Sequence, residues 1–101
     1  MTFSENLAAL PEAKGSRLRL FDEQGREAAV IENAPGTAGS FRVYAYLAGR
    51  HGAINAAAAE EALSIYDEHT EDARLNPGKH PNIDRLFEVL RTGAVLRSTV
   101  E

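Results

Sequence analysis

The residues that most clearly suggest a binding site lie in the glycine-bearing stretch 36–42, which has the sequence GTAGSFR. Glycines let backbone amides approach a ligand, and the start of a helix attracts anions. Gly39, Ser40 and Arg42 are therefore candidates for binding a small anion, such as a phosphate compound. A nucleotide-hydrolysing P-loop needs a lysine beside the second glycine and a longer spacing between glycines, and this stretch has neither. The alternative interpretation is a turn in which Ser40 only caps a helix.

A second group of polar residues, His69, Asp72 and His80, has the chemistry of metal ligands. Imidazole and carboxylate groups that converge from a helix and a loop bind zinc or another divalent ion, and three such ligands with a water form a catalytic geometry. The spacing matches no established metal motif, HExxH included. The alternative interpretation makes His69 an ordinary helix-face residue and His80 the N-cap before Pro81.

Two loops, at 33–40 and 76–82, are long enough to carry function. If they meet in the fold, we expect them to form one pocket. That pocket would contain Arg42, His51, Lys79 and His80. The predicted ligand-binding residues are then Gly39, Ser40, Arg42, His51 and His80.

The charge distribution disfavours nucleic-acid binding. The net charge is -4, from 15 acidic and 11 basic side chains, and the run from Glu60 to Asp72 holds no lysine or arginine. A faint helix-turn-helix pattern would place Glu60 and Glu61 in the recognition helix, where they would repel phosphates. The run is interpreted as a solvated face, partly neutralised by arginines elsewhere, such as Arg17, Arg19 or Arg97.

The composition narrows the class of protein. There is no cysteine, which excludes disulfides, thiolate zinc sites and cysteine nucleophiles. Residues 1–10 do not resemble a signal peptide, and no stretch approaches the roughly 20 apolar residues of a membrane span, so we expect a cytoplasmic protein without membrane contact. No motif such as GxSxG places a nucleophile. The sequence therefore leaves open whether the protein is an enzyme, and it indicates no cofactor.

Apolar periodicity and turn residues predict the elements that must position these groups. A short helix capped by Ser4 ends before Pro11. A hairpin spans 17–31 and turns at Gly25, and a final strand spans 94–100. Further helices are predicted at 41–50, 55–74 and 82–91.

These elements predict a single α+β domain, 1–101, in which a three-stranded antiparallel sheet packs against three to four helices. The amphipathic rings of Tyr44, Tyr46 and Tyr66 and the uncovered sheet edges suggest an interface, so a homodimer is expected. The predicted core consists of Leu18, Leu20, Val30, Val43, Leu47, Ile65, Leu86, Leu90 and Leu96.

Three segments, PGTAGSFRVY, GAINAAAAEEAL and HPNIDRLF, occur in this order along the chain. Read together, they resemble a family of small bacterial proteins of about this length that is catalogued only as a domain of unknown function. The resemblance spans most of the chain and implies a bacterial, cytoplasmic protein. It brings no activity, substrate or catalytic residue with it.

The sequence therefore favours a non-enzymatic module that binds a ligand or another protein. An anionic small molecule at the 36–42 loop, or a protein partner, is the expected binding partner. The alternatives are a metal-assisted enzyme that uses His69, Asp72 and His80, and a phosphate-compound-binding protein that combines the 36–42 loop with His69 and His80.

Overall fold

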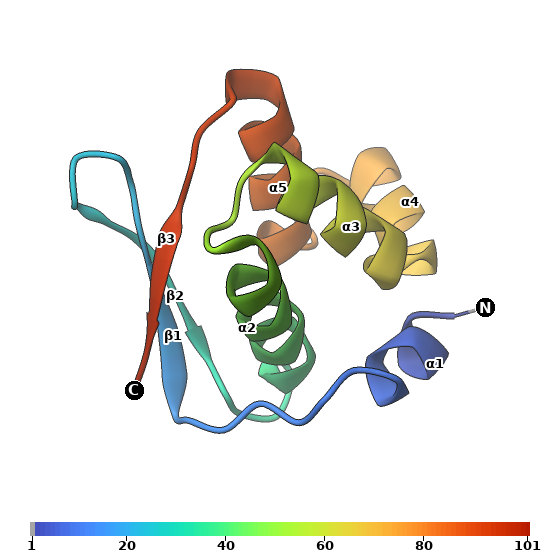
Figure 1. The fold of residues 1–101 in the computed structure, drawn as a ribbon. Helices are drawn as coiled ribbons and strands as arrows, with labels where there is room; N and C mark the ends of the chain where they lie inside the picture. The colour runs from blue at the N-terminus through green and yellow to red at the C-terminus, as the bar shows by residue number, and fades with distance from the viewer. Residues whose placement is uncertain (1) are drawn as a thin grey trace.

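A computed structural model describes residues 2–101 as a sheet on one side and helices on the other, with one helix between them (Figure 1). This confirms the predicted α+β class with its three-stranded antiparallel sheet. None of the helices within residues 2–101 has the length and apolar character that a bilayer crossing demands. In chain order the elements are α1 (Phe3–Ala8), β1 (Arg17–Phe21), β2 (Glu27–Glu32), α2 (Ala38–His51), α3 (Ala56–Tyr66), α4 (Glu68–Leu75), α5 (Pro81–Thr92) and β3 (Arg97–Val100).

The sheet has the order β2-β1-β3, with both pairs antiparallel. Strand β1 alternates as predicted, because Leu18 and Leu20 are fully buried on the inner face while Arg17 and Arg19 point outward. Leu18 lies opposite Ile31 of β2 on one side and Val100 of β3 on the other. The inner face of the sheet therefore rests on α2.

The outer face of the sheet is polar and contains its own ion pairs. Arg17 contacts Glu32 at 3.1 Å, and Arg19 contacts Glu101 at 2.9 Å. The sequence suggested that Arg17 and Arg19 neutralise the acidic helix. In the structure these arginines pair instead with glutamates on or next to the sheet. On that helix, Glu61 is paired with Arg50, and Glu71 with Arg74.

Helix α2 lies between the sheet and the other helices, and its apolar residues are buried on both sides. Phe41, Val43, Tyr44 and Leu47 are each at most 1% exposed. The helix ends where Gly52 adopts a left-handed conformation, at φ 80°, which a glycine tolerates without strain. Two-sided burial fixes the position of α2 in the molecule, and hence where its N-terminus points.

Helix boundaries differ from the prediction at three places. Helix α2 begins at Ala38 rather than at residue 41, so Gly39 and Ser40 already belong to its first turn. Thr2, not Ser4, caps α1, and its hydroxyl and Glu5 form a capping box. The predicted helix 55–74 is divided into α3 and α4 at Asp67.

The break at Asp67 has a local backbone cause. Asp67 has φ 51° and ψ −112°, and it is the only non-glycine residue within 2–101 with positive φ. This region is strained for a residue that has a Cβ. The chain turns there because Thr70, which follows in α4, is buried and its hydroxyl donates to the carbonyl of Leu63. A positive φ at Asp67 and a hydrogen bond between residues seven apart therefore interrupt the helix that the sequence pattern predicts.

Two residues that the sequence analysis places in the core, Val30 and Leu90, are exposed in the structure. Val30 is 38% exposed because it lies opposite Arg19 on the outer face of the sheet, while its neighbour Ile31 points inward. Leu90 is 37% exposed because α5 buries Ile83, Leu86 and Val89 instead.

The other residues predicted for the core are buried or partly buried. Ile65 is only partly buried. Leu96 is buried beside β3, through a bridge to Ile54, but the strand itself starts at Arg97 rather than at residue 94. The buried core residues Leu18, Leu20, Val43, Leu47, Leu86 and Leu96 are confirmed.

We predict that Asp67→Gly stabilises the protein. Glycine adopts the observed backbone conformation without the Cβ clash, and the relief of strain exceeds the entropy that glycine loses on folding, so we expect a gain of about 1 kcal/mol. Chemical denaturation measures the change. Asp67→Ala is the matched control, because it removes the same carboxylate and keeps the Cβ. Equal stability of the two variants would contradict backbone strain at this residue.

Candidate functional site

A cavity of about 590 Å³ lies where α2 and α5 begin. Residues 36–40 form one wall and residues 79–83 form another. The sequence left open whether these two loops meet, and in the fold both contribute to one cavity. The cavity is completed by side chains from α1 and from the α3–α4 region, namely Phe3, Leu7, Tyr66 and His69.

The first turn of α2 presents free backbone donors to this cavity. Its N-cap, Thr37, does not cap the helix with its side chain, because the hydroxyl donates to the carbonyl oxygen of Glu32 at 2.7 Å. Among the described residues, no acceptor bonds the amide groups of Gly39 and Ser40. Unsatisfied N–H groups at a helix start carry partial positive charge. This wall of the cavity therefore attracts negative charge.

Helix α5 presents a similar start to the same cavity. Its N-cap is His80, as the sequence suggested, but the imidazole does not cap the helix. Pro81 at the first position has no N–H, and within residues 2–101 the amide of Asn82 has no acceptor. Two helix N-termini, neither capped by a side chain, thus line one cavity.

Buried tyrosines hold the two helix starts in place. The hydroxyl of Tyr44, on α2, donates to the carbonyl oxygen of Asn82 and accepts from Arg85 at 3.2 Å. Burial raises the pKa of Tyr44 to about 12, so the phenol stays protonated and can donate. Tyr66 donates to Ser40 Oγ at 2.7 Å, and burial raises the pKa of Tyr66 as well. Both rings are buried, contrary to their expected place at an interface.

The hydroxyl of Ser40 can donate a hydrogen bond to a ligand. Its oxygen accepts from Tyr66, and no acceptor within residues 2–101 takes its hydroxyl proton. A hydroxyl carries one donor and two acceptor positions, so this donor is available on the cavity side. Ser40 thus adds a side-chain donor to the backbone donors of α2.

The charged groups of the site form a small network around Asp72. One oxygen of its carboxylate lies 2.7 Å from His80 Nε2 and 3.0 Å from Lys79 Nζ. These contacts, that of His80 foremost, lower the pKa of Asp72 to about 2. Lys79 and His80 line the cavity, whereas Asp72 stands behind them. The cavity is therefore lined by the basic residues of this network and not by its carboxylate.

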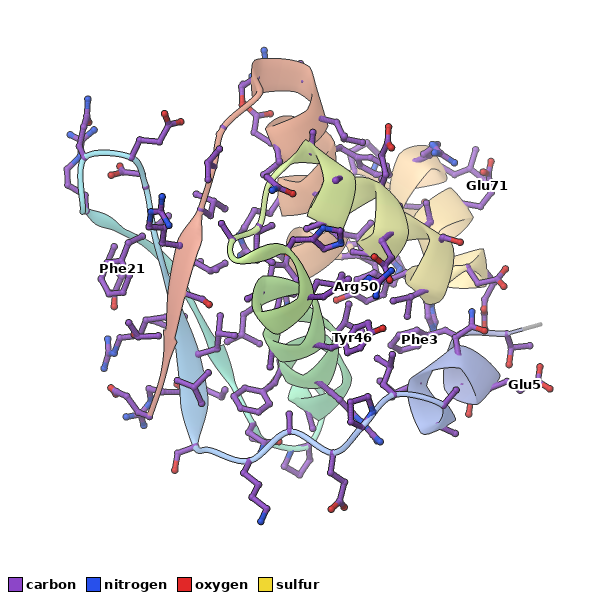
Figure 2. The ribbon with its side chains drawn as sticks, viewed as in Figure 1. Phe3, Glu5, Phe21, Tyr46, Arg50 and Glu71 are labelled. Carbon is purple, nitrogen blue, oxygen red and sulfur yellow. The ribbon has the colours of Figure 1, made fainter. Side chains whose placement is uncertain are left out.

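The remaining wall is apolar and aromatic. Phe3 stacks on Tyr66 with ring centroids 5.0 Å apart and meets the edge of His69 at 5.2 Å. Figure 2 shows Phe3 reaching from α1 toward the other helices. Glu68 holds this end of α1, because its carboxylate accepts from the amide of Phe3 at 2.7 Å. The cavity thus combines a polar end with an apolar side.

Three of the predicted ligand-binding residues line this cavity and two do not. Gly39, Ser40 and His80 contribute to it. Arg42 lies two residues after Ser40, which is about 200° around the helix, and it donates instead to the carbonyls of Leu10 and Pro11. His51 lies at the other end of α2, about 16 Å along the axis from Ser40, where its ring contacts Glu61 at 2.8 Å.

The predicted metal ligands lie close together, but two of them, Asp72 and His80, are already bonded to each other. The rings of His69 and His80 have centroids 5.5 Å apart, and His80 is bonded to Asp72. The ammonium of Lys79 lies on the same carboxylate oxygen, where it competes with a metal ion. Within residues 2–101, no three histidine or carboxylate side chains are arranged to hold a metal. Metal binding at His69, Asp72 and His80 stays a prediction.

Sequence reasoning missed Asn82, Tyr44 and Tyr66, which shape the site. The N1 proline does indicate a helix start with free amides, so Asn82 was within reach of the sequence. The role of the tyrosines depends on which helices pack together, and no local signal carries that information.

The fold and the cavity define a small α+β protein organised around two adjoining helix N-termini. A family model described as "uncharacterized protein conserved in bacteria (DUF2322)" matches residues 3–100. The chain belongs to this bacterial family, which confirms the resemblance read from its segments. No curated protein and no solved structure matches the chain.

We predict that Ser40→Ala destabilises the protein by about 1–3 kcal/mol, because it leaves the buried Tyr66 hydroxyl without its acceptor. Tyr66→Phe on its own should cost less, about 0.5–1.5 kcal/mol, since it leaves no buried donor unpaired. Denaturation of both single variants and the double variant gives the coupling energy. Additive effects would show that the two hydroxyls do not interact.

We predict a pH-dependent contribution from Asp72. Because its pKa is lowered from 3.8 to about 2, its contacts with His80 and Lys79 stabilise the fold above about pH 4. That contribution is lost as the pH falls from about 4 to about 2. The melting temperature of the wild type should therefore exceed that of Asp72→Asn at neutral pH, by a margin that shrinks across this range. A margin independent of pH would contradict the assignment.

Proposed function

We propose that this protein binds a small anionic compound, with a phosphate or carboxylate group, in the cavity between α2 and α5. The observation that carries the proposal is the meeting of two helix N-termini, both lacking side-chain caps, at one cavity. Each helix start favours an anion through its unpaired amides and its dipole. The anion would occupy the polar end of the cavity.

The donors available there suit an oxyanion. The amides of Gly39, Ser40 and Asn82 supply backbone hydrogen bonds, and the Ser40 hydroxyl supplies another. Lys79 adds positive charge from the second loop. Because Lys79 pairs with Asp72, these two charges largely offset each other, and the helix-start amides and the Ser40 hydroxyl supply most of the attraction for an anion. The balance of groups that face the cavity is therefore favourable to negative charge.

The apolar side of the cavity fits the remainder of the ligand. Phe3, Leu7 and Ile83 provide a wall on which a hydrocarbon or planar body can rest. A cavity with one polar end and one apolar side orients an amphipathic molecule. We infer that the ligand is an organic phosphate or carboxylate rather than a bare inorganic ion.

The contacts of Ser40 and His80 favour binding over nucleophilic catalysis. Ser40 Oγ accepts a hydrogen bond from a phenol with a raised pKa, which does not act as a base toward it. His80 Nε2 is paired with Asp72, and within residues 2–101 neither of its ring nitrogens contacts Ser40. The arrangement thus lacks the contact between nucleophile and base that acyl or phosphoryl transfer to serine requires.

A titration followed by NMR tests the proposal, with phenyl phosphate as the probe. We expect saturable amide shifts at Gly39, Ser40 and Asn82, and about fivefold weaker binding by Lys79→Gln, which removes a charge-assisted contact. Arg91→Gln is the matched control, since it neutralises an exposed cation on α5 outside the cavity and should bind like the wild type. Shifts centred elsewhere, or equal affinity of the two variants, would contradict the site.

A further inference from the structure

A second concave surface lies on a different side of α2. It encloses about 680 Å³ along the exposed flank of the helix, between residues 11–14 and the end of β3. Figure 2 shows Tyr46 and Arg50 on the same side of α2. We call this surface the flank groove. Ala45 and Gly49 form its floor, and a Cβ at Gly49 would meet no atom within 4 Å, so the floor is open.

The flank groove is locally basic on an acidic protein. Lys14, Arg42 and Arg50 line it, and Glu12 is the only acidic residue among its lining side chains. Arg42 donates two of the five N–H groups of its guanidinium to backbone carbonyls, which leaves its charge and its other donors in place. Within residues 2–101, neither Lys14 nor Arg42 has a carboxylate within 4.0 Å, while Arg50 shares Glu61 with His51. Lys14 and Arg42 therefore give the groove positive charge that no ion pair within residues 2–101 neutralises.

The rim of the groove, residues 12–14, has backbone amide and carbonyl groups that make no hydrogen bond within residues 2–101. Ala13 packs against the core, while Glu12 and Lys14 are exposed, which is the alternation of an extended chain. Arg42 anchors the start of this segment through the carbonyls of Leu10 and Pro11. The segment is thus held in place with its backbone groups available for pairing.

We propose that the flank groove binds an extended acidic segment of a partner protein. The partner's backbone would pair with residues 12–14, and its carboxylates would contact Lys14, Arg42 and Arg50. Backbone pairing supplies affinity in such strand-like recognition, and charge complementarity supplies orientation and selectivity. Neither the small-anion cavity nor its helix N-termini take part, so this proposal stands apart from the proposed function.

The test uses blocked heptapeptides of alternating glutamate and threonine, with lysine and threonine in the control peptide. We expect the acidic peptide to shift the amides of residues 11–14 and 45–50, to protect those of 12–14 from hydrogen exchange, and to bind more weakly in high salt. The basic peptide should cause none of these effects.

A pair of charge-reversal variants sharpens the test. Lys14→Glu should weaken acidic-peptide binding about tenfold, because it puts a like charge in the groove. Arg97→Glu makes the same charge change on an exposed residue of β3 that does not line the groove, and it should leave affinity unchanged. Melting temperatures close to the wild type confirm that both variants fold.

Three results would overturn the proposal. These are equal binding of the acidic and basic peptides, shifts that lie outside the groove, and equal loss of affinity in the two variants. Sedimentation equilibrium without peptide provides a separate check. A concentration-dependent dimer that Lys14→Glu dissociates would show that a second copy, and not a partner's acidic segment, occupies the groove.

Discussion

The hydrogen bond from Tyr44 to the carbonyl of Asn82 is the contact on which the site depends. Tyr44 is 1% exposed, and a buried phenol needs an acceptor. It finds one in the first turn of α5, and so the interior of α2 is fixed against the beginning of another helix. Tyr66 makes the corresponding contact with Ser40 at the start of α2. The cavity between the two N-termini follows from satisfying two buried hydroxyls.

Helix α2 connects the different parts of the molecule. Its buried residues pack between the sheet and the helices, its N-terminus faces the cavity, and its exposed flank forms the basic groove. The acidic residues Glu60 and Glu71 lie on α3 and α4, away from the cavity lining. Most other arginines pair with carboxylates, as Arg17 does with Glu32 and Arg74 with Glu71, whereas Lys14 and Arg42 in the groove have no such partner among the described residues.

Local signals predicted much of the fold and part of the lining of the candidate cavity. The alternation in β1, the turn at Gly25 and the proline that starts α5 each act within a few residues, and each was interpreted correctly. The break at Asp67 lies within a continuous helical pattern, which does not indicate the positive φ of this residue. The direction of Arg42 depends on how α2 is rotated against the core, which composition and spacing do not determine. Gly39 and Ser40 were found because a helix start is visible in sequence.

The most direct test of the central claim is a crystal structure of the protein grown with tungstate, a tetrahedral oxyanion that anomalous scattering locates. The account predicts a tungsten peak in the cavity, within hydrogen-bonding reach of the Gly39, Ser40 and Asn82 amides. A cavity that stays free of tungstate while the ion binds elsewhere, or a structure in which α2 and α5 do not begin side by side, would contradict it.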